Sequence, residues 1–239
     1  MTSFRKHIIN QVQAIPAGKI FTYRDLDFVP QKRGHVAAVL AELKKKGVVE
    51  KAEKGAFYRP KPSLLGLKSR PLAFPEKLDF ITKELNGYIT GPYIYNRMQL
   101  TEQVPMVITI ATQKQVRSFE KLNIRFHCVK SYLDVTDATN LYQLRLLDAI
   151  KSIKEIPGTT PMDVYVRLLD LHFKKLDIAD LESIKQLAFS YPPRVRRILM
   201  DIFNELGYKA GAIELGKTLN SNTHFKTIIK NYKYDFTRK

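Results

Sequence analysis

The sequence has one cysteine, no tryptophan and no long uninterrupted apolar run. A single cysteine, Cys128, cannot form a disulfide within the chain, so a disulfide framework is excluded and a reducing compartment fits. No segment approaches the roughly 18 to 20 apolar residues that a helix needs to cross a bilayer. The opening residues, MTSFRKHIINQVQ, lack the apolar core of a signal peptide. We therefore expect a soluble, cytoplasmic protein.

The sequence also lacks the short motifs that often mark catalysis or phosphate binding. It contains no Walker A pattern, no G-x-G-x-x-G, no G-x-S-x-G and no H-E-x-x-H. The five histidines are scattered without the spacing of metal ligands. Acidic pairs such as Asp177 and Asp180 lie at expected helix starts, where N-capping explains them better than catalysis does. We expect a protein that is not an enzyme and that has no metal and no cofactor.

Positive charge is abundant and unevenly distributed. The chain has 40 Lys and Arg against 23 Asp and Glu, a net charge of +17, and an isoelectric point near 9.8. Residues 1–62 hold 13 of the basic and 5 of the acidic residues, which gives this quarter of the chain a net charge of +8. A concentrated positive charge favours a polyanionic partner, nucleic acid before membrane, although a generally basic surface is an alternative.

Residues 1–62 show the element order of a winged helix-turn-helix. The sequence predicts a helix from an N-cap at Ser3 to about residue 13, a strand over 19–21, and a short helix over 22–28 behind a Thr-x-x-Asp capping box. A third helix over 33–46 carries one apolar stripe, formed by Val36, Val39, Leu40 and Leu43. Strands over 48–52 and 56–59 then meet at Gly55, which suits a tight hairpin.

In that fold the third helix usually lies in the DNA major groove, with its N-terminal end at the base edges. Arginine and lysine can read guanine there, and glutamine can read adenine. Small residues on the same helix, such as Ala38, would let the backbone approach the groove. The expected DNA-binding residues, on the helix and on the hairpin that forms the wing, are Gln31, Lys32, Arg33, His35, Lys45, Lys51, Lys54 and Arg59. The alternative is a basic helix used for protein contact.

Prolines punctuate residues 60–75 and indicate a linker, with a domain boundary near residue 62. The second domain, residues 63–239, is expected to open with helices over 76–85 and 93–100, followed by strands over 104–112 and 123–129. Within the second of these strands His127 and Cys128 point to opposite faces, which favours a buried structural cysteine over a reactive pair. From residue 138 onward the pattern is helical, over 138–154, 161–175, 178–189, 193–206 and 210–219. The predicted fold class is α+β, an N-terminal winged helix-turn-helix followed by a larger α+β domain with a small sheet and a helical C-terminal half.

One basic group in the second domain stands out because of its position. Arg194, Arg196 and Arg197 lie at the start of an expected helix, where positive charge opposes the helix dipole. Such a placement favours an anionic or acidic partner, although a plain surface face is an equal alternative. The C-terminal tail, 226–239, is rich in lysine and tyrosine and is a further candidate for partner binding.

Several segments resemble the bacterial type IV antitoxins of the AbiE (abortive infection) family. In the first domain they are IPAGKIFTYRDL and RGHVAAVLAELKKKGVVEKAEKGAFYRP. In the second they are GPYIYNRMQLTEQVPMVITIAT, YPPRVRRILMDIFNELG and LNSNTHFKTIIKNY, so that the resemblance extends over nearly the full length.

The resemblance implies an antitoxin encoded beside a nucleotidyltransferase-like toxin. Such an antitoxin represses its own operon through the winged helix and counters the toxin through the C-terminal domain, without necessarily forming a stable complex with it. The implied partners are double-stranded operator DNA and the co-encoded toxin, with no role for a membrane. Arg194, Arg196 and Arg197 match a basic segment of the family and are the candidates for neutralisation. The alternative from the residues alone is a winged-helix transcriptional regulator whose C-terminal domain senses a ligand or partner.

Overall fold

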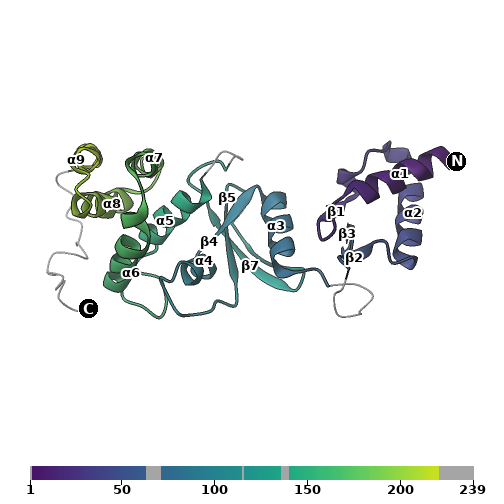
Figure 1. Ribbon diagram of the computed structural model, residues 1–239, viewed down its shortest axis with the longest axis horizontal. Helices are drawn as coiled ribbons and strands as arrows, with labels where there is room; N and C mark the ends of the chain where they lie inside the picture. The colour runs from purple at the N-terminus through teal and green to yellow at the C-terminus, as the bar shows by residue number, and fades with distance from the viewer. Residues whose placement is uncertain (1, 63–70, 115, 136–139, 221–239) are drawn as a thin grey trace. The chain divides into compact units, whose positions relative to one another are not determined.

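The computed structural model describes residues 2–62, 71–114, 116–135 and 140–220 (Figure 1). Its architecture is α+β, with helices around two small sheets. The chain divides into two compact units, Met1–Leu85 and Asn86–Lys239. The expected boundary near residue 62 lies ahead of helix α3 (Phe74–Leu85), which groups with the first unit.

The first unit places helices α1 (Thr2–Ala14) and α2 (Arg33–Lys45) beside a small antiparallel sheet. Its strands are β1 (Ile20–Thr22), β2 (Glu50–Glu53) and β3 (Ala56–Tyr58), in the order β1-β3-β2. Two single turns of 3-10 helix, Tyr23–Asp25 and Pro30–Lys32, connect β1 to α2.

The core of the first unit forms where α1 and α2 meet. The four residues of the expected stripe on α2 are all buried, and they pack with Ile8 and Val12 of α1, both of which have no exposed surface. Burying an aliphatic side chain of this size stabilises a fold by about 1.5–3 kcal/mol. Gly47 then ends the helix at φ 71°, and Gly55 turns the β2–β3 hairpin at φ 80°, conformations that side chains with a Cβ rarely adopt.

The segment between β1 and α2 differs from the expected helix over 22–28. The capping box is present, because the Thr22 amide donates to the Asp25 carboxylate at 2.7 Å, but the helix stops after one 3-10 turn. Leu26 is extended and turns its side chain into the core, and the amide of Asp27 donates to Gln11 of α1 at 2.7 Å. Tertiary contacts therefore replace the helical hydrogen bonds. Ser3 also differs from its expected role, since α1 begins before it.

The second unit begins with a mixed sheet and one short helix. Its elements are β4 (Gly87–Thr90), α4 (Pro92–Arg97), β5 (Ile108–Thr112), β6 (Ser118–Lys121) and β7 (Ile124–Lys130). The strand order is β4-β5-β7-β6, with β5 and β7 parallel and the outer pairs antiparallel. The strands expected over 104–112 and 123–129 correspond to β5 and β7, but β5 begins only at Ile108, and Val104 and Met106 before it are exposed. Strands β4 and β6 were not predicted.

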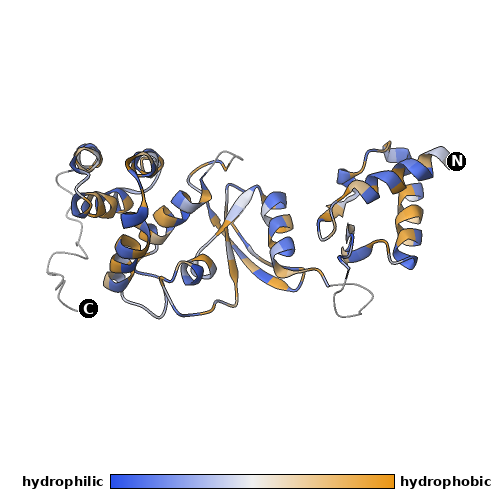
Figure 2. Cartoon of the chain, in the orientation of Figure 1, coloured by the Kyte–Doolittle hydropathy of each residue, from blue (hydrophilic) through white to orange (hydrophobic). Residues whose placement is uncertain are grey.

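The C-terminal half of the second unit is helical, as expected. It consists of α5 (Leu141–Lys151), α6 (Pro161–Arg167), α7 (Ile178–Ala188), α8 (Pro193–Glu205) and α9 (Lys209–Lys217). A π-helical turn, Leu168–His172, and a 3-10 turn, Phe173–Lys175, extend α6. Helix α5 is buried along its length, with the sheet on one side and α7 and α8 on the other (Figures 1 and 2).

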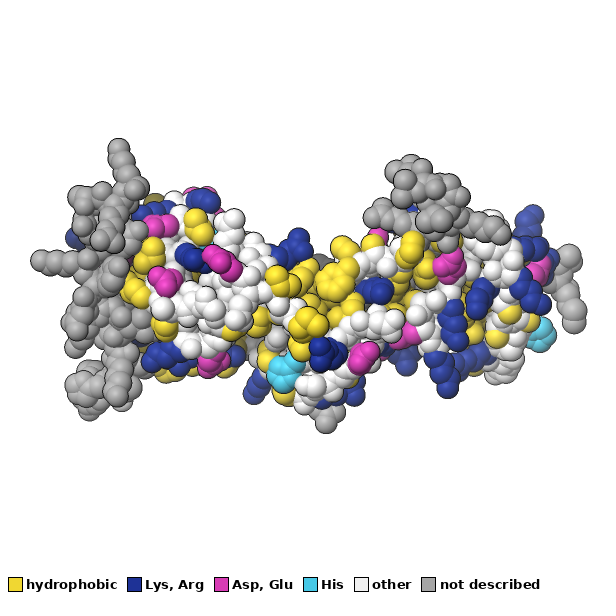
Figure 3. Space-filling model, turned by 90° about the horizontal axis from the view of Figure 1, so that it is seen from below, with side chains coloured by type: hydrophobic (Ala, Val, Ile, Leu, Met, Phe, Trp, Pro, Cys, Tyr) yellow, Lys and Arg dark blue, Asp and Glu magenta, His cyan; other side chains and the backbone are white. Residues whose placement is uncertain are grey.

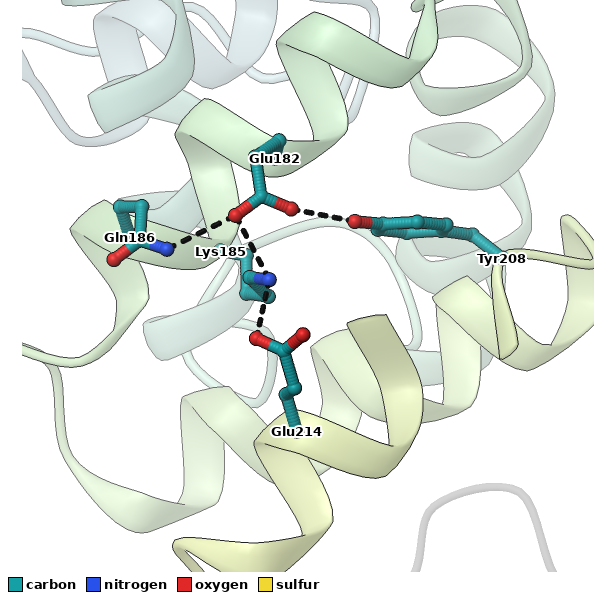
Figure 4. A network of polar contacts seen from close by, with 5 residues as sticks. All are labelled: Glu182, Lys185, Gln186, Tyr208 and Glu214. Carbon is teal, nitrogen blue, oxygen red and sulfur yellow. Dashed lines mark hydrogen bonds and ion pairs between the residues drawn. The ribbon is translucent and has the colours of Figure 1, made fainter. Parts of the chain in front are cut away.

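A polar network joins α7 to α9 at the end of this helical half (Figure 4). The ammonium of Lys185, only 2% exposed, contacts Glu182 at 2.8 Å and Glu214 at 2.5 Å. Glu182 also accepts hydrogen bonds from Tyr208 at 2.5 Å and from Gln186 at 2.9 Å. Burial alone would lower the pKa of Lys185, but its two carboxylate partners outweigh burial and raise that pKa. The network therefore holds a buried charge in its ionised form.

This network predicts a pH-dependent contribution to stability. Hydrogen bonds from Lys185 and then from Tyr208 lower the pKa of Glu182 from 4.5 to about 2. A depressed folded-state pKa means that the contribution is complete above about pH 4.5 and is lost as the pH falls toward about 2. Lys185→Met should reduce the free energy of unfolding at pH 7 by about 1 kcal/mol, because both carboxylates are partly solvated. The difference from wild type should shrink as the pH falls through that window.

Urea unfolding at several pH values, followed by circular dichroism, measures this difference. Lys174→Met is the matched control, because Lys174 pairs with Asp170 at 2.6 Å while remaining half exposed. An exposed pair of this kind contributes about 0–1 kcal/mol. If the Lys185→Met difference does not change between pH 7 and pH 2.5, the network does not contribute in the way described.

Candidate nucleic-acid interface

The outward face of α2 is formed by small residues and ends in a lysine. Gly34, Ala38, Ala41 and Lys45 are all exposed and lie opposite the buried stripe of the same helix. A Cβ placed on Gly34 would meet nothing within 4 Å, so this position faces open space. No long side chain precedes Lys45 on this face. The backbone of the helix could therefore lie close to the bases if α2 entered a DNA major groove.

Two cations stand at the N-terminal end of α2 and rest on aromatic rings of the same unit. The Lys32 ammonium lies 4.5 Å from the ring centre of Phe4, and the Arg33 guanidinium lies 5.2 Å from that of Tyr23. Both side chains are exposed, and within the described residues neither has an acidic partner. Cation–π contacts of this kind contribute about 0.5–1 kcal/mol at exposed sites. They orient the two cations while leaving their charge uncompensated.

The remaining expected residues at this end of the helix are polar and exposed. Gln31 and His35 are both on the surface, and no hydrogen bond is formed by either side chain within the described residues. Together with Lys32 and Arg33 they place an amide, an imidazole and two cations around the first turn of α2.

The one acidic residue of α2 is neutralised locally. Glu42 contacts Arg5 of α1 at 2.5 Å and Lys46 at 2.8 Å, and these hydrogen bonds, Lys46 first, lower the pKa of Glu42 to about 2. The same contact with Arg5 ties α1 to α2. The carboxylate is thus paired with cations rather than free to repel a polyanion.

The hairpin carries two further exposed cations. Lys51 and Lys54 are exposed, and in the part of the chain that the structure describes neither forms an ion pair. Arg59 behaves differently, because its guanidinium donates to the backbone carbonyls of Gln13 at 2.6 Å and Ile15 at 2.7 Å. These bonds close the C-terminal end of α1, so the structure gives Arg59 a structural contact. Lys and Arg side chains are in view over the first unit in Figure 3.

The three arginines of α8 do not form one exposed cluster. The Arg194 guanidinium donates to the carbonyl of Lys151 and so holds α8 to the end of α5. Arg197 lies 3.6 Å from Asp201 one turn later. Arg196 is half buried, and its Nε has no hydrogen-bond partner among the described residues. Only Arg196 and Arg197 therefore remain as candidates for contact with a partner.

Sequence reasoning missed a buried carboxylate in α5. Asp148 is 7% exposed and accepts hydrogen bonds from the hydroxyls of Tyr88 at 2.8 Å, Thr90 at 2.7 Å and Tyr191 at 2.9 Å. Burial raises the pKa of Asp148, and the three hydroxyl donors oppose that rise. A charged residue inside the apolar run LLDAI was the one signal of it in the sequence.

His172, in the π-helical turn, was also missed as a contact residue. Its Nδ1 lies 2.8 Å from the hydroxyl of Tyr142, and its Nε2 lies 2.9 Å from the carbonyl of Met98. A neutral imidazole that donates from Nε2 and accepts at Nδ1 satisfies both contacts. Burial lowers the pKa of His172, which agrees with that neutral form.

The described residues contain no group of three or more His, Cys, Asp or Glu arranged to hold a metal ion. Among the same residues, no helix is both long and apolar enough to span a membrane.

No protein-family model matches this chain, and no curated protein matches it. Among solved structures, it is similar to the crystal structure of the RV2827C protein from Mycobacterium tuberculosis, with 15% sequence identity and a TM-score of 0.44. The likeness covers 92% of this chain and 83% of that one. At this TM-score it carries no conclusion about fold or function.

Proposed function

We propose that the first unit is a winged helix-turn-helix that binds double-stranded DNA. The observation that carries the proposal is the exposed face of α2, formed by small residues from Gly34 to Ala41, together with two cations at the start of the helix, Lys32 and Arg33, which have no acidic partner among the described residues. The order helix, strand, two 3-10 turns, helix and hairpin also supports it, with the two turns in the place of the expected second helix. In this proposal α2 lies in the major groove, with Gln31, Arg33 and His35 at base edges.

The proposed DNA-binding cations form two groups: those at the N-terminal end of α2 are placed near base edges, and those farther from it are placed near phosphates. Lys32 and Arg33 stand at the N-terminal end of α2, where a recognition helix meets base edges. Lys45 at its other end and Lys51 and Lys54 on the hairpin suit the phosphate backbone, whose contacts position a protein without reading sequence. We do not include Arg59 among the DNA-binding cations, because its guanidinium donates hydrogen bonds to backbone carbonyls at the end of α1.

We further propose that the protein is the antitoxin of a type IV toxin–antitoxin system and represses its own operon. The support is the resemblance of both halves of the sequence to AbiE-family antitoxins. The second unit would counter a co-encoded nucleotidyltransferase-like toxin, with or without a stable complex. Arg196 and Arg197 on α8 are the side chains that we propose for this role, whereas Arg194 holds α8 to α5.

A gel-shift assay with the DNA upstream of the gene tests the repressor half. We expect a sequence-selective shift at near-physiological salt, and the logarithm of the binding constant should fall with the logarithm of salt concentration by about 0.9 per phosphate neutralised. Five cations near DNA (Lys32, Arg33, Lys45, Lys51 and Lys54) would give a slope of roughly −4 to −5. Equal binding to unrelated DNA would contradict a repressor.

Co-expression with the neighbouring gene tests the antitoxin half. The neighbouring gene alone is expected to arrest growth, and this protein is expected to restore it. Arg196→Ala with Arg197→Ala should weaken rescue without loss of operator binding, while Lys217→Ala, a substitution of a last-turn lysine on α9, is the matched control. A neighbouring gene without toxicity, or one that is still toxic in the presence of this protein, would refute the antitoxin role.

A second candidate function is a winged-helix transcriptional regulator whose second unit senses a small ligand. The observation that favours it is a cavity of about 210 Å³ in the second unit, lined by charged and hydroxyl-bearing side chains. A nucleotidyltransferase-like gene beside this one favours the antitoxin, and its absence favours the sensor.

A further inference from the structure

One aromatic ring, that of Tyr23, lies beneath the arginine at the start of α2. The Arg33 guanidinium stands over this ring, 5.2 Å from its centre. Tyr23 is half-buried in the 3-10 turn that follows β1, whereas Arg33 is exposed. The contact therefore joins the turn after β1 to the first residue of α2.

The backbone around Tyr23 is fixed by the capping box of its turn. The Thr22 amide donates to the Asp25 carboxylate at 2.7 Å, and the Arg24 amide donates to the Thr22 hydroxyl at 3.2 Å. Reciprocal bonds of this kind satisfy amides that the short turn leaves without a backbone partner. The Tyr23 side chain therefore starts from a backbone that is held by hydrogen bonds on both sides of it.

The ring of Tyr23 is held in turn by an aromatic ring of strand β3. The ring centre of Phe57 lies 5.8 Å from that of Tyr23, with the two planes at 89°, and 6.0 Å from that of buried Phe21. Edge-to-face pairs are favourable beyond the area that they bury, because the positive edge of one ring meets the negative face of the other. Tyr23 and Phe57 both pack against the core of the first unit. The ring under Arg33 is thus anchored to that core.

Strand register also places Phe57 beside a cation of the hairpin. Phe57 is paired with Phe21 of β1 on one side and with Lys51 of β2 on the other. Side chains at paired positions share one face of a sheet, so this row ends in an exposed lysine. Phe57 therefore lies between Lys51, which we place near phosphate, and the ring that carries Arg33, which we place near base edges.

This arrangement restricts a side chain that would otherwise be flexible. Ordering a long side chain when a partner binds reduces the affinity by about threefold to tenfold. A guanidinium that already rests on an anchored ring has lost part of its freedom before DNA arrives. Arg33 should therefore bind a base edge at a smaller cost in conformational entropy than an arginine without such a ring.

We propose that Tyr23 is a positioning residue for DNA reading by α2, and that it contributes to sequence selectivity through Arg33. Its ring holds the guanidinium at the first turn of α2, and Phe57 holds the ring. The proposal rests on the DNA-binding function proposed above. Loss of the ring is expected to weaken binding to the operator and to leave binding to unrelated DNA unchanged, because phosphate contacts supply non-specific binding.

NMR of the free protein tests the positioning without DNA. Arg33 side-chain protons are expected upfield of those of Arg24, because the ring current of Tyr23 shields groups above its face. Arg24 is exposed and stands over no ring within the described residues. The upfield shift should persist in Tyr23→Phe and disappear in Tyr23→Leu. Its absence from the wild type overturns the proposal, and this comparison needs no variant that has to fold. A wild type that shows the shift but binds no DNA would refute the DNA-binding function instead.

Fluorescence anisotropy with operator and with unrelated DNA at fixed salt tests the effect on reading. Tyr23→Leu should weaken operator binding about threefold to tenfold and change binding to unrelated DNA by less than about twofold. Tyr23→Phe keeps the ring and should retain operator affinity within about twofold. A loss in Tyr23→Phe as large as that in Tyr23→Leu overturns the proposal, because the hydroxyl and not the ring would then matter.

The same measurement in an Arg33→Ala background separates positioning from a general effect on the fold. Tyr23→Leu should cause no further loss there, because the side chain that the ring positions is absent. Phe4→Leu is the matched control, since Phe4 lies 4.5 Å from the ammonium of Lys32, and its effect should be the same in both backgrounds. An equal loss from Tyr23→Leu with and without Arg33 would show that Tyr23 does not act through Arg33.

Discussion

Replacing Ala38 with glutamate is expected to abolish binding to operator DNA while leaving the fold intact. Ala38 is exposed at the centre of the outward face of α2, so a longer side chain meets no part of the protein. In the proposed complex the new carboxylate faces the groove, where like-charge contact costs several kcal/mol. The expected loss of affinity is about 100-fold or more, measured by gel shift or fluorescence anisotropy at fixed salt.

Three further variants separate charge from shape and from general effects. Ala38→Gln keeps the bulk without the charge and should have an intermediate effect. Ala210→Glu makes the same charge change on exposed α9 in the second unit and should leave affinity within about threefold. Lys32→Ala with Arg33→Ala should weaken binding by about 1–3 kcal/mol if these side chains read bases. Retained affinity in both Ala38→Glu and the double variant would show that α2 is not the reading helix.

Replacing Asp148 with alanine is expected to destabilise the second unit by about 3–5 kcal/mol. Three hydroxyls donate to this carboxylate, and each buried donor left without an acceptor costs about 1–3 kcal/mol. The substitution also removes a buried carboxylate, and this offsets part of the cost. Burial makes the ionised form of Asp148 less favourable and raises its pKa. Thermal and urea unfolding followed by circular dichroism measure the loss.

Tyr191→Phe is the matched control for this prediction. It removes one donor and leaves Asp148 with the other two, so it should cost only about 1 kcal/mol. A loss as large as that of Asp148→Ala would mean that packing of the Tyr191 ring, which lies 4.8 Å from the ring of Tyr132, matters more than the hydroxyl network. An unchanged stability of Asp148→Ala would show that the three hydroxyls find other acceptors.

Elements with strong local signals could be predicted from the sequence. Helix α2 was predicted to within one residue, because its apolar stripe and Gly47 specify both its face and its end. Helices α7 and α8 follow from Asp177, whose side chain caps the first, and from Pro193, which opens the second. In each case local chemistry and burial agree.

Elements defined by their neighbours could not be predicted in this way. Strand β4 has four residues and starts at Gly87, so it becomes a strand only because β5 lies beside it. The helix expected over 22–28 shortens to one turn because the core takes Leu26 and α1 takes the amide of Asp27. Strand pairing and tertiary contact decide these segments, and neither leaves a local pattern.

The candidate sites show the same division. Lys32, Arg33 and Lys54 were expected on the surface and are exposed there, whereas Arg59 and Arg194 each bind backbone carbonyls. A long basic side chain looks the same in the sequence whether it reaches solvent or a helix end. The cavity of the second unit left no motif, because strand register alone aligns two of its lining residues, Thr109 and His127.

Because Cys128 is buried, its chemical modification can report how often the sheet of the second unit opens. This thiol is fully buried in β7, and burial raises its pKa, so both its access to reagents and its thiolate fraction are low in the closed state. Because it is the one cysteine in the chain, any modification by an aromatic disulfide reports a single event, the parting of the sheet around β7. The modification rate reports the frequency of that event under native conditions, and no cysteine has to be introduced or removed by mutation.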